Sequence, residues 1–87
     1  MAKKKEVTKP YKATLQIGSE TFESSGDDAV DAILNLKPDR IMSRAVFTLE
    51  HDGKTSSFMK TVGRARMVFH SRLNATILAR NLKLRLR

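Results

Sequence analysis

The chain has 87 residues, and a chain of this length buries only somewhat more than roughly 60% of its unfolded surface, which allows one hydrophobic core and one domain. Seventeen Lys and Arg against nine Asp and Glu give a net charge of +8, which favours a polyanionic partner such as nucleic acid. The absence of cysteine excludes a disulfide framework, a thiolate nucleophile and a cysteine-based zinc site.

The first ten residues, M-A-K-K-K-E-V-T-K-P, lack apolar periodicity and end at a proline, so we expect residues 1–10 to form a flexible basic arm. The chain contains neither an apolar signal core near its start nor a run of about 20 apolar residues, which a membrane span requires. We therefore expect a cytoplasmic protein, with residues 11–87 forming a single domain.

Alternating apolar residues from Tyr11 to Ile17 predict a β-strand. Gly18-Ser19 then offers a two-residue turn with glycine first, as a type II′ hairpin turn requires. A hairpin in this register sets Leu15 opposite Phe22 on the half-buried face of the strand pair.

A short helix is predicted next. Ser25 and Asp28 match the spacing of a capping box, so we expect the helix to begin there. Ala29 and the apolar residues that follow it at helical spacing share one face, and Pro38 excludes helical geometry at the preceding residue.

The second half of the chain repeats this plan. Alternation from Ile41 to Leu49 predicts a strand, and Asp52-Gly53 is a strong hairpin signal that pairs Phe47 with Phe58 and Val46 with Met59. Thr61 can cap a second helix, whose core face carries four residues at helical spacing: Val62, Ala65, Phe69 and Leu73.

Residues 73–87 form a basic C-terminal element that fits two structures. A helix capped by Asn74 places Arg80, Lys83 and Arg87 in one stripe beside an apolar face, whereas a strand alternates leucine with Lys83, Arg85 and Arg87. We favour the helix because Ala, Leu and Arg are good helix formers. The predicted fold class is α+β, with two β-hairpins in one antiparallel sheet, helices on one face (ββαββα) and an extra C-terminal helix or strand.

Charge is segregated along the sequence. Residues 13–36 carry a net charge of −5, residues 61–87 carry +7, and no acidic residue follows Asp52. We expect this segregation to produce a basic surface opposite an acidic one.

The inventory of catalytic groups is small. His51 and His70 fall on separate predicted elements, and the four glycines stand apart, so no phosphate-binding glycine loop occurs. Asp27, Asp28 and Asp31 imitate a magnesium-binding D-D-x-x-D motif, but acids in a first helical turn also follow from the helix macrodipole. We expect no catalytic residue, metal or cofactor, and therefore no enzyme.

Non-enzymatic binding of DNA or RNA fits the composition best, because Lys and Arg release counterions from phosphates whatever the fold. The candidate phosphate contacts are the basic residues of the arm and the last quarter: Lys3, Lys4, Lys5, Arg64, Arg66, Arg80, Lys83, Arg85 and Arg87. Phe47 and Phe58 suit a small core better than a base-stacking platform, which is the alternative for this pair.

The alternative function is a structural subunit of a homo-oligomer or larger assembly, which would use the acidic and basic surfaces and bury Leu84 and Leu86, or Met67 and Val68. A membrane surface fits less well, because the basic end lacks Trp and Phe.

The order of motifs over residues 13–70 runs T-F-x-x-x-G-D-D-A-V-D-A-I-L-N-L-K-P, then D-G-K, then R-A-R-M-V-F. This order resembles small accessory and virion proteins of bacteriophages. The resemblance implies a virion location and carries no functional residue with it.

Overall fold

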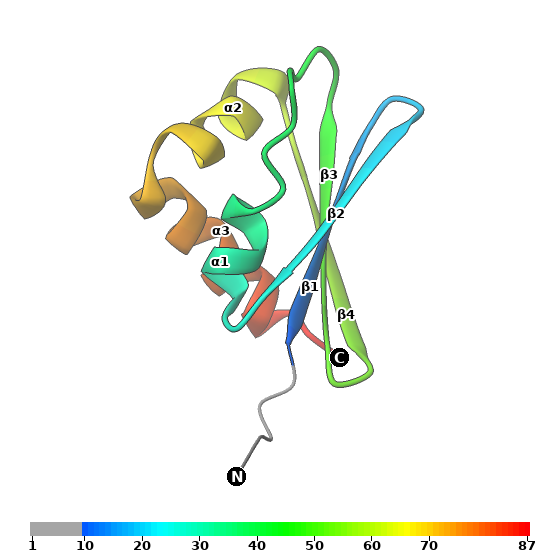
Figure 1. Ribbon diagram of the computed structural model, residues 1–87, viewed down its shortest axis with the longest axis vertical. Helices are drawn as coiled ribbons and strands as arrows, with labels where there is room; N and C mark the ends of the chain where they lie inside the picture. Colours follow the sequence, from blue (N-terminus) through cyan, green and yellow to red (C-terminus); the bar gives the residue numbers. More distant parts are fainter. Residues whose placement is uncertain (1–9) are drawn as a thin grey trace, which may run out of the picture.

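The computed structural model describes residues 10–87 as a four-stranded antiparallel sheet with three helices packed on one of its faces (Figure 1). The elements are, in chain order, β1 Tyr11–Ile17, β2 Glu20–Gly26, α1 Ala29–Leu34, β3 Ala45–His51, β4 Lys54–Lys60, α2 Val62–His70 and α3 Arg72–Leu84. The predicted α+β fold is confirmed. The predicted arm, apart from Pro10, lies outside the described residues.

The strand order is β2-β1-β3-β4, so each hairpin supplies one central strand and one edge strand. Gly18 has a φ of 60° without a positive φ at Ser19, as in the predicted type II′ turn, while Asp52 and Gly53 both have positive φ, as in a type I′ turn. Both predicted hairpin registers are confirmed, because Leu15 pairs with Phe22 and Phe47 pairs with Phe58.

The core lies between the sheet and the helices. Alternate residues of the two central strands, such as Leu15, Phe47 and Leu49, pack against Leu78 and Leu82 of α3. Phe47 is only 1% exposed, and its ring centroid lies 5.9 Å from that of Phe69 in α2. The base-stacking alternative for Phe47 and Phe58 is therefore wrong, since Phe47 is buried under the helices.

The start of α1 differs from the prediction. Its N-cap is Asp28, whose side chain accepts a hydrogen bond of 2.8 Å from the Val30 amide, and not Ser25. Ser25 still belongs to β2, where it pairs with Lys12, and the next residue, Gly26, pairs with Tyr11. The residue after Ser25 is therefore still in the strand and not in the first turn of a helix, so Ser25 cannot be the cap. Gly26 passes so close to α1 that an added Cβ would lie 2.8 Å from the Ala32 nitrogen.

The third strand is shorter than the alternation indicated. It begins at Ala45, and the predicted extension from Ile41 is instead a loop that tucks Ile41 into the core. Ala45 pairs with Ile17, the last residue of β1, and with Lys60, the last residue of β4. No neighbouring strand continues beyond these pairs, so residues 41–44 have no backbone to hydrogen-bond with as a strand.

A break at Ser71 separates α2 from α3. Ser71 has extended backbone angles, so α2 ends at His70 and the expected continuation to Leu73 is wrong. Leu73 lies in the first turn of α3 and is 69% exposed, whereas Val68, expected on an exposed face with Met67, is buried. Reorientation of the chain at Ser71 accounts for the change at Leu73.

The C-terminal element is a helix, as favoured. Its N-cap is Ser71 and not Asn74, and it ends at Leu84. Leu86 and Arg87 therefore follow the helix, and Leu86 is partly buried against the core instead of being left for a partner. Arg87 does not continue the stripe of Arg80 and Lys83.

Two hydrogen bonds tie the end of α3 and the following tail to β4. The buried Ser56 hydroxyl donates to the Leu82 carbonyl at 2.7 Å, and the Thr55 amide donates to the Arg87 carbonyl at 3.3 Å. Residues 85–87 therefore lie beside the edge strand. Within residues 10–87 no helix is both long and apolar enough to cross a membrane.

Candidate nucleic-acid interface

Besides Lys54 at the start of the strand, four basic residues gather along the helix-facing side of the edge strand β4. Two of them lie over the ring of Phe58, with the Lys60 ammonium 5.0 Å and the Arg85 guanidinium carbon 4.8 Å from its centroid. These four residues, which we call the β4 strip, are Lys60, Arg64, Arg85 and Arg87.

The two ends of the β4 strip are set by neighbouring elements. Arg64, in the first turns of α2, lines the same shallow pocket as Lys60. At the other end, the hydrogen bond to Thr55 places Arg87 beside the beginning of β4. The distance from Thr55 to Lys60 along a strand is about 17 Å. A strip of that length faces several phosphates, because duplex DNA carries one charge per about 1.7 Å of its axis.

Lys60 was not among the residues predicted from the sequence. The alternation of β4 places it on the same side as Ser56 and Phe58, where it pairs with the buried Ala45. A lysine on the core side of a strand signals that the strand lies at an edge, with its end open to solvent. That signal was present in the sequence, but it became informative only once the strand order was known.

The elements that carry the β4 strip are basic, although Glu50 of β3 pairs with Thr55 and Asp52 lies in the turn before β4. The ion pair between Arg72 and Asp31, at 3.4 Å, involves no residue of the strip. The elements β4, α2 and α3 contain no acidic residue. Mutual repulsion among such cations is relieved when a polyanion binds.

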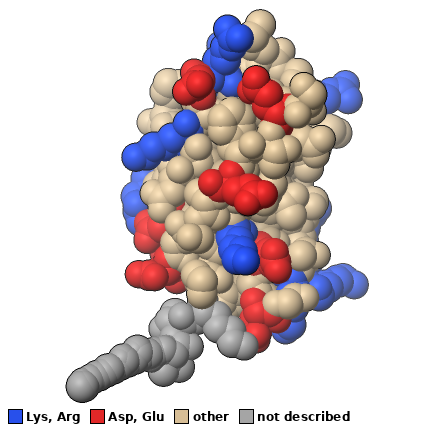
Figure 2. Space-filling view, turned by 45° about the vertical axis from the view of Figure 1, so that its right-hand side comes forward, with Lys and Arg blue, Asp and Glu red and all other residues tan. Residues whose placement is uncertain are grey.

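Five of the eight acidic residues among residues 10–87 lie on β2 or at the start of α1, and β2 is the strand farthest from β4. Glu20 and Glu23 belong to β2, while Asp28 caps the adjacent α1 and Asp31 lies in its first turn. Figure 2, which turns the sheet side of the molecule forward, shows acidic side chains spread over the middle of that surface. The acidic segment of the sequence thus lies away from the β4 edge, while Glu50 and Asp52 remain near it.

The open face of the sheet carries little of the positive charge. Its charged residues within β1 to β4 are Lys12, Glu23 and Glu50, and Lys12 pairs directly with Glu50 across the strands. No aromatic residue of these strands points to that face. A polyanion therefore meets a more favourable surface at the β4 edge than on the open face.

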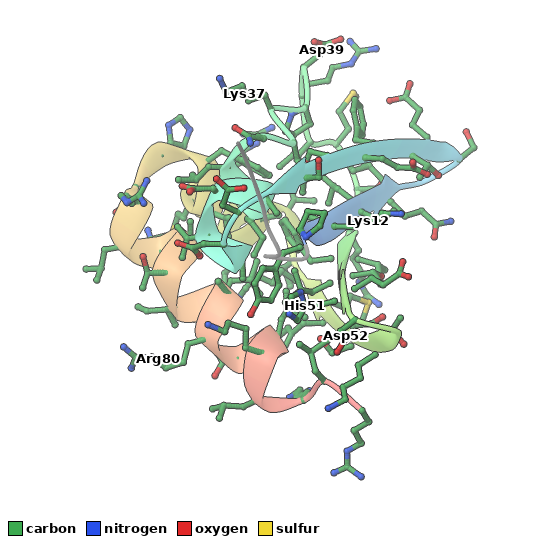
Figure 3. The ribbon with its side chains drawn as sticks, turned by 60° about the horizontal axis from the view of Figure 1, so that its bottom comes forward. Lys12, Lys37, Asp39, His51, Asp52 and Arg80 are labelled. Atoms are coloured by element: carbon green, nitrogen blue, oxygen red, sulfur yellow. The ribbon has the colours of Figure 1, made fainter. Side chains whose placement is uncertain are left out.

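Arg80 and Lys83 lie on the other flank of α3. They line a pocket of about 440 Å³ that Asp28 and Val30 close on the α1 side. Figure 3 shows Arg80 projecting from α3 away from the sheet, and the Lys83 ammonium lies 5.6 Å from the Tyr11 ring centroid. The predicted stripe of Arg80, Lys83 and Arg87 is therefore not one surface.

Arg66 belongs to a third group of basic side chains. It lines a pocket of about 390 Å³ with Arg40, Phe69 and His70, and it donates a hydrogen bond of 3.1 Å to the Ile41 carbonyl. The other histidine, His51, stacks on Tyr11 of β1 with ring centroids 3.8 Å apart. His51 and His70 therefore belong to different sites. Lys3, Lys4 and Lys5 lie outside the described residues.

The acidic D-D-x-x-D segment has structural contacts in two of its three members. Asp28 caps α1, and Asp31 in the first turn of that helix pairs with Arg72 of α3. These contacts agree with the macrodipole explanation of the segment.

Of the predicted phosphate-binding residues, the structure brings Arg64, Arg85 and Arg87 together with the unpredicted Lys60, and it separates Arg66, Arg80 and Lys83 from them. The resemblance to bacteriophage proteins stays a prediction. Neither a family model, a curated protein nor a solved structure matches this chain, so the β4 strip is the feature from which a function is inferred.

Proposed function

We propose that this protein binds nucleic acid, without catalysing a reaction, through phosphate contacts made by the β4 strip. The observation that supports the proposal is the gathering of Lys60, Arg64, Arg85 and Arg87 along one edge strand with no acidic residue on the elements that carry them. Each phosphate that such a cation neutralises releases condensed counterions, which drives binding.

The other predicted residues act at longer range in this proposal. Arg66, Arg80 and Lys83 lie on other flanks of α2 and α3, where they add to the positive potential that attracts a polyanion. Lys3, Lys4 and Lys5 contribute to the same potential. The β4 strip makes the close contacts and sets where the nucleic acid lies.

The test compares two variants that lose the same charge. The strip variant replaces Lys60, Arg64, Arg85 and Arg87 with Gln, and the control variant replaces four exposed cations elsewhere, Lys12, Lys37, Arg40 and Arg44, with Gln. Fluorescence anisotropy with labelled DNA at about 50 mM salt should show at least about a 100-fold loss of affinity for the strip variant. The control variant should lose only a few-fold, and equal losses would reject the strip as the contact surface.

A second candidate function, an assembly subunit, is favoured by a different observation. Leu73 and Leu84 lie on the solvent side of α3 and are 69% and 79% exposed. Leucines of this kind are what a partner chain covers in an oligomer. Light scattering of the purified protein before and after nuclease treatment separates the two functions. A mass that falls with nuclease supports nucleic-acid binding, and a multimeric mass that persists supports assembly.

A further inference from the structure

A small groove lies directly beside the β4 strip, between α2 and α3. It has a volume of about 150 Å³, and Lys60 and Arg64 of the strip form one of its borders. Its remaining walls are Met67, Val68, Asn74 and Ile77. Because two cations belong to both features, a chain of phosphates on the strip passes the mouth of the groove.

The groove exposes apolar side chains that the fold itself does not cover. Met67 is 52% exposed and Ile77 is 47% exposed, although both flank the buried Val68. A methionine sulfur makes favourable contacts with aromatic rings, and the isoleucine adds apolar surface against which a ring can pack. The walls therefore suit a planar aromatic group.

The size of the groove matches a group of about one ring. A cavity of roughly 150 Å³ lined by apolar side chains accommodates benzene. A pyrimidine base has one six-membered ring, whereas a purine adds a second ring. The volume therefore favours a pyrimidine.

One polar side chain of the groove lining, Asn74, can hydrogen-bond such a base. The Asn74 amide nitrogen donates a hydrogen bond of 3.2 Å to the Met67 carbonyl. The other polar atom of that side chain, Oδ1, receives no hydrogen bond from residues 10–87. Oδ1 can accept from the N4 amino group of cytosine or from the N3–H of thymine or uracil, which lie on the Watson–Crick edge of these bases.

We propose that the groove between α2 and α3 receives the base of one unpaired pyrimidine nucleotide while the β4 strip holds the phosphates on either side of it. This inference rests on the proposed function and narrows its ligand to single-stranded nucleic acid. A base inside a duplex has both its edge and its faces occupied, so it enters the groove only after unpairing and unstacking. Single strands offer the base without that cost.

The experiment holds the phosphates constant and removes the bases. Affinities are measured for oligothymidylate of about 15 nucleotides and for an abasic strand of the same length. The protein should bind oligothymidylate at least about fivefold more tightly, which is the lower end of the effect of one stacked base. A duplex of the same length carries twice the phosphates but keeps its bases paired, so its affinity should not change when the groove residues Ile77 and Met67 are replaced.

Two variants on the same helix locate the effect. Ile77→Gln should abolish the preference for oligothymidylate while leaving affinity for the abasic strand unchanged. Leu73→Gln is the matched control, because Leu73 is also an exposed apolar residue of α3 but does not line the groove, and it should keep the preference. Met67→Gln provides a second groove variant, and circular dichroism checks that each protein is folded.

Equal affinity for oligothymidylate and the abasic strand would overturn the proposal, as would a preference that survives both Ile77→Gln and Met67→Gln. Loss of the preference in the Leu73→Gln control would also overturn it. Failure of the proposed function gives a different result, namely no binding to any of the strands at about 50 mM salt.

Discussion

Replacement of glycine by alanine has opposite consequences at Gly26 and at Gly63. At Gly26 an added Cβ would lie 2.8 Å from the Ala32 nitrogen and 3.0 Å from the Asp31 Cβ, whereas at Gly63 nothing lies within 4 Å. Gly26 is required because β2 and α1 approach each other closely there. Gly63 has no such neighbour and weakens the first turn of α2.

Gly26→Ala should therefore destabilise the protein by about 1–3 kcal/mol, because the backbone of α1 has to shift away from the new methyl group. Gly63→Ala should instead stabilise it by up to about 1 kcal/mol. Urea denaturation of both variants measures the two free energies. An unchanged stability for Gly26→Ala would show that α1 does not pack on β2 at this distance.

Phe47 is the largest fully buried side chain, with its ring between the sheet and α2. Phe47→Ala should lower the free energy of unfolding by about 3–5 kcal/mol, since truncation of a buried aromatic leaves a cavity in a small core. Thermal or urea unfolding provides the measurement. A loss below about 1 kcal/mol would contradict the burial of this ring.

Among the elements, the contact between β4 and α3 positions the tail that carries Arg85 and Arg87. The Ser56 hydroxyl is buried and donates to the Leu82 carbonyl, while the neighbouring Ser57 lies on the open face, within 3.1 Å of the Thr48 hydroxyl. One serine thus joins the two layers, and the next joins two strands at the surface.

Ser56→Ala should destabilise the protein by about 1–3 kcal/mol, because the buried Leu82 carbonyl loses a donor. It should also raise the hydrogen-exchange rate of the Thr55 amide, which bonds to Arg87. Ser57→Ala serves as the control and should stay within about 0.5 kcal/mol of the unmodified protein. Equal effects of the two substitutions would mean that Ser56 does not hold α3 against the sheet.

The elements that could be predicted from the sequence are those specified by residues close together in the chain. The hairpins and their registers depend on two-residue turns, and Gly18-Ser19 and Asp52-Gly53 specify those turns chemically. The boundaries of the helices depend on partners distant in sequence. Ser25 extends β2 because Lys12 pairs with it, and nothing in the local pattern excluded it as a cap.

At the scale of the whole molecule, the strand order decides where the acidic and basic segments of the sequence lie on the surface. The composition of each segment was evident from the sequence, but only the order β2-β1-β3-β4 places the acidic strand and β4 at opposite edges. Arg64, Arg85 and Arg87 were predicted as contacts because they lie in the basic last quarter of the sequence. Lys60 lies between them in space, and it was missed because its position at the sheet edge depends on the strand order.

The salt dependence of binding to duplex DNA tests the phosphate contacts of the β4 strip most directly, because a duplex engages the strip without filling the groove between α2 and α3. Four contacts at roughly −0.9 each predict that log K falls against log salt with a slope of about −3.6 or steeper. Replacing Lys60, Arg64, Arg85 and Arg87 with Gln should flatten that slope by about 3.6, while the Lys12, Lys37, Arg40 and Arg44 control should change it by less than about one. A slope near zero for the unmodified protein, or an unchanged slope in the strip variant, would contradict the account.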